Sequence, residues 1–64
     1  MTRREKDVME HLVSGKTNKQ IALALGISPY TVRDHLSSLM RKMDVESRTG
    51  LITEYLLSAR ELTP

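Results

Sequence analysis

The sequence predicts an all-α domain with four helices. Two observations support this prediction. Residues that commonly cap helices stand ahead of four segments, and apolar residues recur within those segments at the three- and four-residue intervals of a helix face. No segment alternates polar and apolar residues as a half-buried strand does. We expect the helices at about residues 3–14, 18–25, 29–43 and 48–60.

Capping boxes mark the starts of the first two segments. The first box pairs Thr2 with Glu5, three residues later, and the second pairs Thr17 with Gln20 in the same way. In such a box, each side chain accepts from a backbone N–H group of the other residue. A glycine follows each segment, where helices often end. The apolar positions of these two segments are Val8, Met9, Leu12, Val13, Ile21, Ala24 and Leu25.

The third segment has the clearest helix signals. Ser28 is a favourable N-cap and Pro29 suits the first helical position. Residues 44–46 end the segment, and Ser47 can cap the fourth. The predicted apolar stripes are Val32, Leu36, Leu39, Met40 and Met43, followed by Leu51, Ile52, Tyr55, Leu56 and Ala59.

A short connection containing a glycine joins the second and third segments. A turn of this kind, at residues 26–28, lets two helices cross steeply, so we expect a helix-turn-helix arrangement. The connection at residues 15–17 is equally short, and the first three helices must therefore share a core. We expect this core to contain Leu12, Ile21, Leu25, Val32 and Leu36, with Ile27 at its edge.

Composition excludes several classes of protein. The chain has 64 residues, enough for one domain spanning 1–64, and no cysteine for a disulfide or a thiolate metal site. His11 and His35 lack metal-ligand spacing. No apolar run approaches the roughly 20 residues that cross a bilayer, so we expect a cytoplasmic protein without membrane contact. No nucleophile with a base and no pocket is indicated, so we expect neither an enzyme nor a cofactor.

The basic residues are concentrated although the net charge is small. Ten Lys and Arg against eight Asp and Glu leave a net charge of +2, which does not by itself distinguish a nucleic-acid binder. The acidic residues lie mainly toward the two ends of the chain. The central stretch instead carries Lys16, Lys19, Arg33, Arg41 and Lys42 and is the candidate contact surface.

The run TNKQIALALGISPYTVRDHLSSLMRKMDVESR resembles the C-terminal DNA-binding domain of the LuxR family, also called GerE-like. The segments TRRE, NKQIA, TVRDH and KMDVESR occupy the pattern of that family in register. The resemblance implies a four-helix domain whose third helix reads DNA and whose fourth helix commonly pairs two copies on a two-fold site. In this family the domain usually follows a receiver domain, as in two-component response regulators, or a small-molecule-binding domain, and the alternative is a free-standing regulator. Met1, Gln20 and Asp34 depart from the usual residues of the pattern.

The polar face of the third helix is the predicted reading surface. Opposite the apolar stripe, this face consists of Tyr30, Arg33, Asp34, Ser37, Ser38 and Arg41. Arg33 can donate to both acceptors on a guanine edge. Asp34 either accepts from a cytosine amino group or is a solvated acid that weakens nonspecific binding. Ser37 is short enough to touch a base or a phosphate.

The start of the second helix is the predicted phosphate clamp. Thr17, Asn18 and Lys19 lie where unpaired backbone N–H groups and the helix dipole attract an anion, and the resemblance implies that this turn holds the DNA backbone. Further predicted phosphate contacts are Thr31, Arg41 and Lys42. Alternatively, Thr17 is only a cap and Lys42 only a solvated charge. Because both match the pattern of the family, Arg48 and Glu5 are predicted to pair.

A dimer surface is predicted on the fourth helix. Gly50, Thr53 and Leu57 lie opposite its inward stripe, and a glycine there could let a second copy approach closely. Two copies would then occupy half-sites about one helical turn apart. The alternative is a frayed terminal helix with one stray leucine.

The predicted function is sequence-specific binding of double-stranded DNA by a bacterial transcriptional regulator, with residues 29–43 in the major groove. Its predicted partners are duplex DNA and a second copy of the chain, and RNA polymerase is a further candidate. The alternative from another class is a helical module whose basic face binds an acidic protein. The terminal domain of a sigma-type promoter factor shares the turn, but NKQIA and KMDVESR favour the LuxR-like interpretation.

Overall fold

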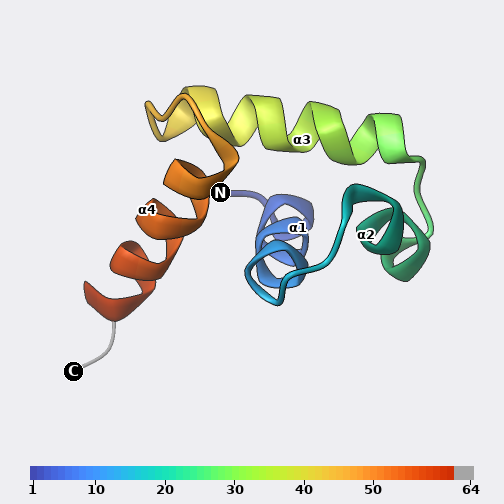
Figure 1. The fold of residues 1–64 in the computed structure, drawn as a ribbon, viewed down its shortest axis with the longest axis horizontal. Coiled ribbons are helices and arrows are strands. Elements are labelled where there is room, and N and C mark those ends of the chain that lie inside the picture. The colour runs from blue at the N-terminus through green and yellow to red at the C-terminus, as the bar shows by residue number, and fades with distance from the viewer. Residues whose placement is uncertain (62–64) are drawn as a thin grey trace.

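The computed structural model describes residues 1–61, with side chains through Ser58, and it contains four helices in the predicted order (Figure 1). The helices are α1 at Arg3–Val13, α2 at Asn18–Leu25, α3 at Pro29–Lys42 and α4 at Arg48–Glu61. Each observed boundary lies within one residue of its prediction, and residues 1–61 include no strand. The all-α, four-helix prediction is confirmed.

The helix α3 lies along one side of the domain. Figure 1 shows α1 between α2 and α4, beneath α3. α1 and α3 each pack against all three other helices, so these two helices form the centre of the fold. This arrangement leaves the far side of α3 facing solvent.

The core lies between α1 and α3 and is completed by residues of α2 and α4. The buried apolar side chains are Val8, Met9, Leu12, Ile21, Ala22, Val32, Leu36, Leu39 and Leu51. Four of the five predicted core residues are among them, and the fifth, Leu25, is partly buried against this cluster, as is Ile27. Two apolar positions were predicted wrongly: Ala24 is exposed while Ala22 is buried, and Leu56 is 51% exposed. The predicted inward position of Ala59 falls outside the described side chains.

The predicted helix starts are confirmed. The Thr2 hydroxyl accepts from the Glu5 N–H group at 3.1 Å, and the Glu5 carboxylate accepts from the Thr2 N–H group at 2.9 Å. Thr17 and Gln20 form the same reciprocal box at α2. At α4, the Ser47 hydroxyl accepts from the Gly50 N–H group at 3.0 Å.

The first three helices end in one kind of motif. In each, a backbone N–H group donates to the carbonyl five residues earlier, and the residue just before the donor has a positive φ. The donor and acceptor pairs are Lys16 with His11, Ile27 with Ala22, and Val45 with Met40. The left-handed residues are Gly15, Gly26 and Asp44, with φ of 88°, 68° and 55°. This is a Schellman arrangement, which satisfies carbonyls that the helix itself leaves unpaired. The sequence indicates the two glycine stops but not the left-handed Asp44.

Replacing Asp44 by glycine should stabilise the domain. A side chain in the left-handed region carries a steric cost of roughly 1 to 2 kcal/mol, which glycine avoids. Part of this gain is offset, because glycine loses more conformational freedom on folding. We expect Asp44→Gly to raise the free energy of unfolding by about 0.5 to 1 kcal/mol in urea titrations. Asp44→Ala is the control, because it removes the carboxylate but keeps the Cβ. An equal gain in both variants would show that the charge, and not the backbone, limits stability.

The described part of the chain holds neither a membrane-spanning helix nor a metal-ligand cluster. Its longest helices have 14 residues, and none combines the length and apolarity needed to cross a bilayer. Within the same residues, His, Asp and Glu side chains form no group of three or more that could hold a metal ion.

Candidate nucleic-acid interface

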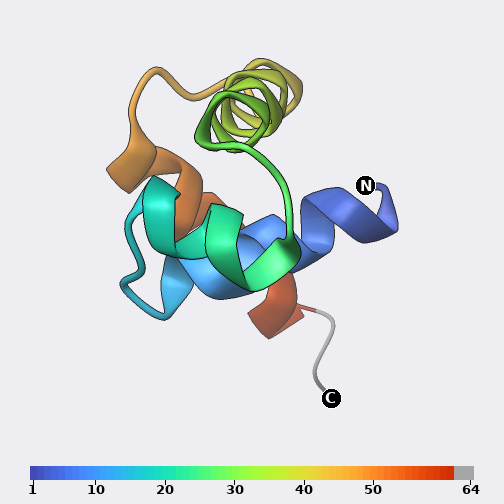
Figure 2. The ribbon, with the colours of Figure 1, turned by 90° about the vertical axis from the view of Figure 1, so that its right-hand side faces the viewer.

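α3 presents a polar face on the side away from the core. Figure 2, which looks nearly along this helix, shows it at the edge of the domain, with one flank against the other helices. The residues buried on its inner flank are Val32, Leu36 and Leu39. The predicted reading residues that are exposed are Tyr30, Arg33, Asp34, Ser37 and Arg41. Ser38 and Thr31 are half-buried at the margin of this face.

The first turn of α3 is fixed by its cap. The Ser28 hydroxyl accepts from the Thr31 N–H group at 3.1 Å and lies 3.0 Å from the Thr31 hydroxyl. Pro29 occupies the start of the helix, where its ring restricts φ to a helical value. The side chains of this turn, including that of Tyr30, therefore project from a constrained backbone.

Arg33 lies over an aromatic ring. Its guanidinium carbon is 5.5 Å from the centroid of the Tyr30 ring. Among the side chains through Ser58, no carboxylate forms an ion pair with Arg33, and Asp34 pairs with no cation. The charges of Arg33 and Asp34 therefore remain available to a ligand.

The start of α2 combines a capped turn with unpaired backbone donors. The Gln20 amide oxygen accepts from the Thr17 N–H group at 2.8 Å, and the Thr17 hydroxyl accepts from the Gln20 N–H group at 3.2 Å. The structure thus confirms that Thr17 is a cap. Asn18 and Lys19 follow as the first helical residues, whose N–H groups have no acceptor within a helix. An anion would find two donors and the positive end of the helix dipole at this point.

Arg48 braces this turn from α4. Its guanidinium donates to the Asn18 side-chain oxygen at 2.7 Å and to the Lys16 backbone oxygen at 3.1 Å. The predicted pairing of Arg48 with Glu5 is therefore wrong. The motif identifies Arg48 but not its acceptor, because a guanidinium bonds amide and carbonyl oxygens as readily as a carboxylate. Arg48 was not among the predicted site residues, and no local sequence signal places it beside Asn18.

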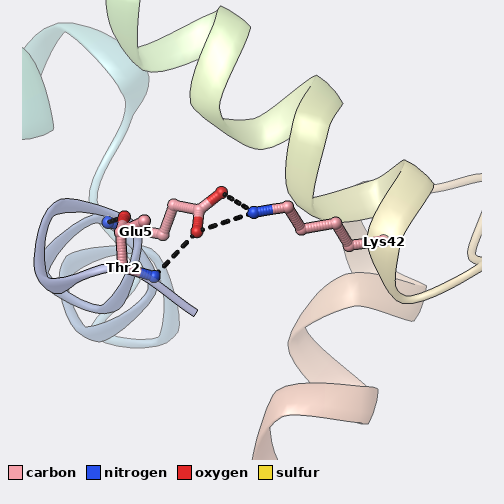
Figure 3. A network of polar contacts seen from close by, with 3 residues as sticks. All are labelled: Thr2, Glu5 and Lys42. Atoms are coloured by element: carbon pink, nitrogen blue, oxygen red, sulfur yellow. Dashed lines mark hydrogen bonds and ion pairs between the residues drawn. The ribbon is translucent and has the colours of Figure 1, made fainter.

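Lys42 joins the end of α3 to the start of α1 (Figure 3). Its ammonium group donates to both oxygens of Glu5, at 3.1 and 2.9 Å. Glu5 is only 4% exposed, so this ion pair and the Thr2 N–H bond replace water around its carboxylate. The backbone bond from Thr2 and the bond from Lys42 lower the pKa of Glu5 from 4.5 to about 2. The predicted phosphate contact of Lys42 remains a prediction, and it requires that Lys42 share its charge with Glu5.

The lowered pKa of Glu5 predicts a specific acid sensitivity. Ionised Glu5 stabilises the fold fully above the unfolded-state pKa near 4.5, and this contribution is lost as the pH falls toward the folded-state pKa of about 2. We expect the stability difference between the wild type and Glu5→Gln to shrink over that interval, as measured by urea titrations at a series of pH values. Glu10→Gln, at an exposed position of the same helix, is the matched control. A difference that stays constant down to the lower pH would contradict the assignment.

Two of the five basic residues of the central stretch already form polar contacts with other side chains of the protein. Lys19, Arg33 and Arg41 are exposed and belong to no ion pair among the described side chains. Lys42 is held by Glu5, and the Lys16 ammonium lies 2.7 Å from a ring nitrogen of His11. The cations available without rearrangement are those at the start of α2 and on the outer face of α3.

The predicted dimer surface on α4 is altered at one position. A Cβ on Gly50 would lie 3.2 Å from the Ser47 hydroxyl and 3.4 Å from the Val45 Cβ atom, so Gly50 faces the chain's own α3–α4 connection. Packing within the chain therefore explains this glycine, and Gly50 gives no support for the approach of a second copy. Thr53 and Leu57 are exposed as predicted. Leu56, which was predicted to face inward, is exposed beside them.

Comparison with known proteins agrees with the four-helix fold. Residues 1–55 match the family described as bacterial regulatory proteins, luxR family. The spore germination protein GerE of Bacillus subtilis is 46% identical over 56 residues, which make up 88% of this chain and 76% of GerE. A solved structure of the transcription factor GerE superimposes with a TM-score of 0.88 at 36% identity, covering 92% of this chain and 88% of that one.

Two longer relatives extend the comparison. The uncharacterized transcriptional regulatory protein YhcZ of Bacillus subtilis is 53% identical over 49 residues, and the nitrate/nitrite response regulator protein NarP of Escherichia coli is 45% identical over 56 residues. The matches span 77% and 88% of this chain but only 23% and 26% of those proteins. The chain belongs to the luxR family of bacterial regulatory proteins and has the four-helix fold of GerE.

Proposed function

We propose that this chain recognises a specific duplex DNA site by placing the outer face of α3 in the major groove. The observation that carries the proposal is the exposure of Arg33 and Asp34 on a helix whose opposite flank is the core. A major groove admits one α-helix, and it displays acceptors on guanine and a donor on cytosine that suit these two side chains. Ser37 is exposed one turn beyond Arg33 on the same face, so it would be the next side chain to meet a base or a phosphate.

The DNA backbone would be held on either side of this helix. At α2, the N–H groups of Asn18 and Lys19 and the exposed Lys19 side chain would hold one phosphate, at a helix start that Thr17 caps and Arg48 braces. On α3, the proposed phosphate contacts are Thr31 and Arg41, with Lys42 at the end of the helix. Such contacts fix the orientation of the protein, whereas the base contacts carry the sequence preference.

Selection from a random duplex pool, followed by titration at several salt concentrations, tests this proposal. We expect enrichment of a defined site, and an affinity that falls as salt rises because bound phosphates release counterions. A scrambled duplex of equal length and composition is the control. Equal weak binding to every duplex, together with tighter binding to an acidic peptide, would favour the protein-partner alternative instead.

We also propose that two copies pair through α4 on DNA. Thr53, Leu57 and the adjacent Leu56 form the candidate surface, and Gly50 serves the fold of its own chain instead of the contact. The patch is small, so pairing should depend on two half-sites about one helical turn apart. Sedimentation of Leu57→Asp on a two-site duplex should show lost cooperativity, whereas Leu23→Asp, at an exposed leucine on α2, should retain it. Equal cooperativity in both variants would remove α4 from the interface.

The regulatory role follows from DNA binding. A transcriptional regulator changes how RNA polymerase reaches or leaves a promoter, so polymerase in the bacterial cytoplasm is the proposed functional partner. NarP is named as a response regulator, and its match to this chain covers 26% of its length. We infer that this chain binds DNA in a signalling response comparable to that of a response regulator. Run-off transcription from a promoter carrying the selected site, with purified polymerase, would show a change in transcript yield that the scrambled site lacks.

A further inference from the structure

Tyr30 is a large aromatic residue with no place in the core. It lies at the second position of α3 and is 73% exposed. Exposed tyrosines are common, but this ring is held by a turn that Ser28 and Pro29 constrain. The backbone from which the ring projects is therefore fixed.

The described neighbour of the Tyr30 ring is the guanidinium of Arg33, one helical turn later. The distance of 5.5 Å to the ring centroid falls within the range of a cation–π contact. Arg33 has no carboxylate partner among the described side chains, so the ring is the group that the structure places against the guanidinium. A free arginine side chain populates many rotamers, and ordering it on binding costs affinity.

A contact with an aromatic ring leaves an arginine better able to read a base than an ion pair with a carboxylate does. A guanidinium that lies over a ring uses its flat face and keeps its N–H groups available along its edge. Guanine is read by two of those N–H groups, one to each acceptor. A carboxylate partner would occupy the same N–H groups and would have to be displaced.

We propose that Tyr30 is a positioning residue that sets the base preference of the domain through Arg33. The ring holds the guanidinium over the outer face of α3 before DNA binds, so less side-chain freedom is lost when Arg33 meets a guanine. The inference rests on the proposed function, because it assumes that α3 enters the major groove. It adds that Tyr30 determines specificity through the face of its ring.

The test compares Tyr30→Leu, which removes the aromatic face, with Tyr30→Phe, which keeps it and removes the hydroxyl. Each variant is made with Arg33 intact and with Arg33→Ala. The dissociation constant is measured for the selected duplex and for a duplex changed at the base pair whose preference Arg33→Ala relaxes. We expect Tyr30→Leu to lower the ratio of the two constants about two- to fivefold, the range for an exposed cation–π contact. Tyr30→Phe should keep the ratio, whatever its effect on total affinity. When Arg33→Ala is also present, Tyr30→Leu and Tyr30→Phe should give the same ratio.

A second readout needs no DNA. In the free protein, the ring current of Tyr30 should shift the Arg33 side-chain proton resonances, and this shift should survive Tyr30→Phe and disappear in Tyr30→Leu. An equal loss of discrimination in both variants would assign the effect to the hydroxyl, and a loss that persists with Arg33→Ala would assign it to a direct contact; either result overturns the proposal. A wild type that prefers no duplex defeats the proposed function itself, whereas a preference unaffected by Tyr30→Leu defeats only the role of Tyr30.

Discussion

Replacing Leu51 by alanine is expected to lower the free energy of unfolding by about 2 to 5 kcal/mol, the usual range for a fully buried leucine. Leu51 of α4 is completely buried, and it joins that helix to the core shared by α1 and α3. A domain of this size has a total stability of roughly 3 to 10 kcal/mol, so the substitution should remove much of it. Urea titration followed by circular dichroism measures the change.

The matched control for Leu51 lies on the same helix. Leu57 is 47% exposed, so Leu57→Ala should change the free energy of unfolding by about 0.5 kcal/mol or less. This pair separates the loss of core packing from any general effect of alanine on α4. If the two variants were equally stable, α4 would not be packed as described.

Arg33→Ala is expected to give the largest change in DNA recognition. Loss of a contact from one guanidinium to two guanine acceptors costs about 1 to 3 kcal/mol of discrimination, or roughly 5- to 150-fold in the preference at one base pair. The preference at other positions should persist, because their contacts come from other residues. Selection from a random pool with the variant, beside the wild type, would identify the position that is relaxed.

Lys19→Ala distinguishes base reading from phosphate binding. Lys19 is an exposed cation at the start of α2, so its removal should weaken binding to all duplexes alike and lower the slope of affinity against salt by about one. Arg33→Ala should instead act mainly on one base pair. If both variants reduced affinity without altering any preference, Arg33 would be a phosphate contact and the reading residue would lie elsewhere on α3.

Local chemistry explains why the helices could be predicted closely. Threonine with a glutamate or glutamine three residues later, and serine before proline, identify helix starts through hydrogen bonds that form within one turn. The third helix end was harder to foresee. Asp44 adopts a left-handed backbone that aspartate tolerates only at a cost, and the motif depends on backbone bonds that the sequence does not specify.

Contacts between distant residues limited the prediction of the site. Glu5 pairs with Lys42 and Arg48 with Asn18, each across 30 or more residues, and the motifs identify these residues without identifying their partners. The orientation of Gly50 was also missed, because it depends on the path of the α3–α4 connection. In contrast, the outer face of α3 could be predicted, since helical periodicity alone separates its polar residues from its buried stripe.

Titration of the isotopically labelled domain with its selected duplex, followed by backbone amide resonances, tests the central claim most directly. Arg3 and Lys6 on α1 are exposed cations as well, so attraction by charge alone would perturb their helix too. We predict that the largest changes fall at residues 17–19 and along the outer face of α3, while the outer face of α1 changes little. Changes concentrated on α1, or spread evenly over all exposed cations, would contradict recognition of DNA through α3.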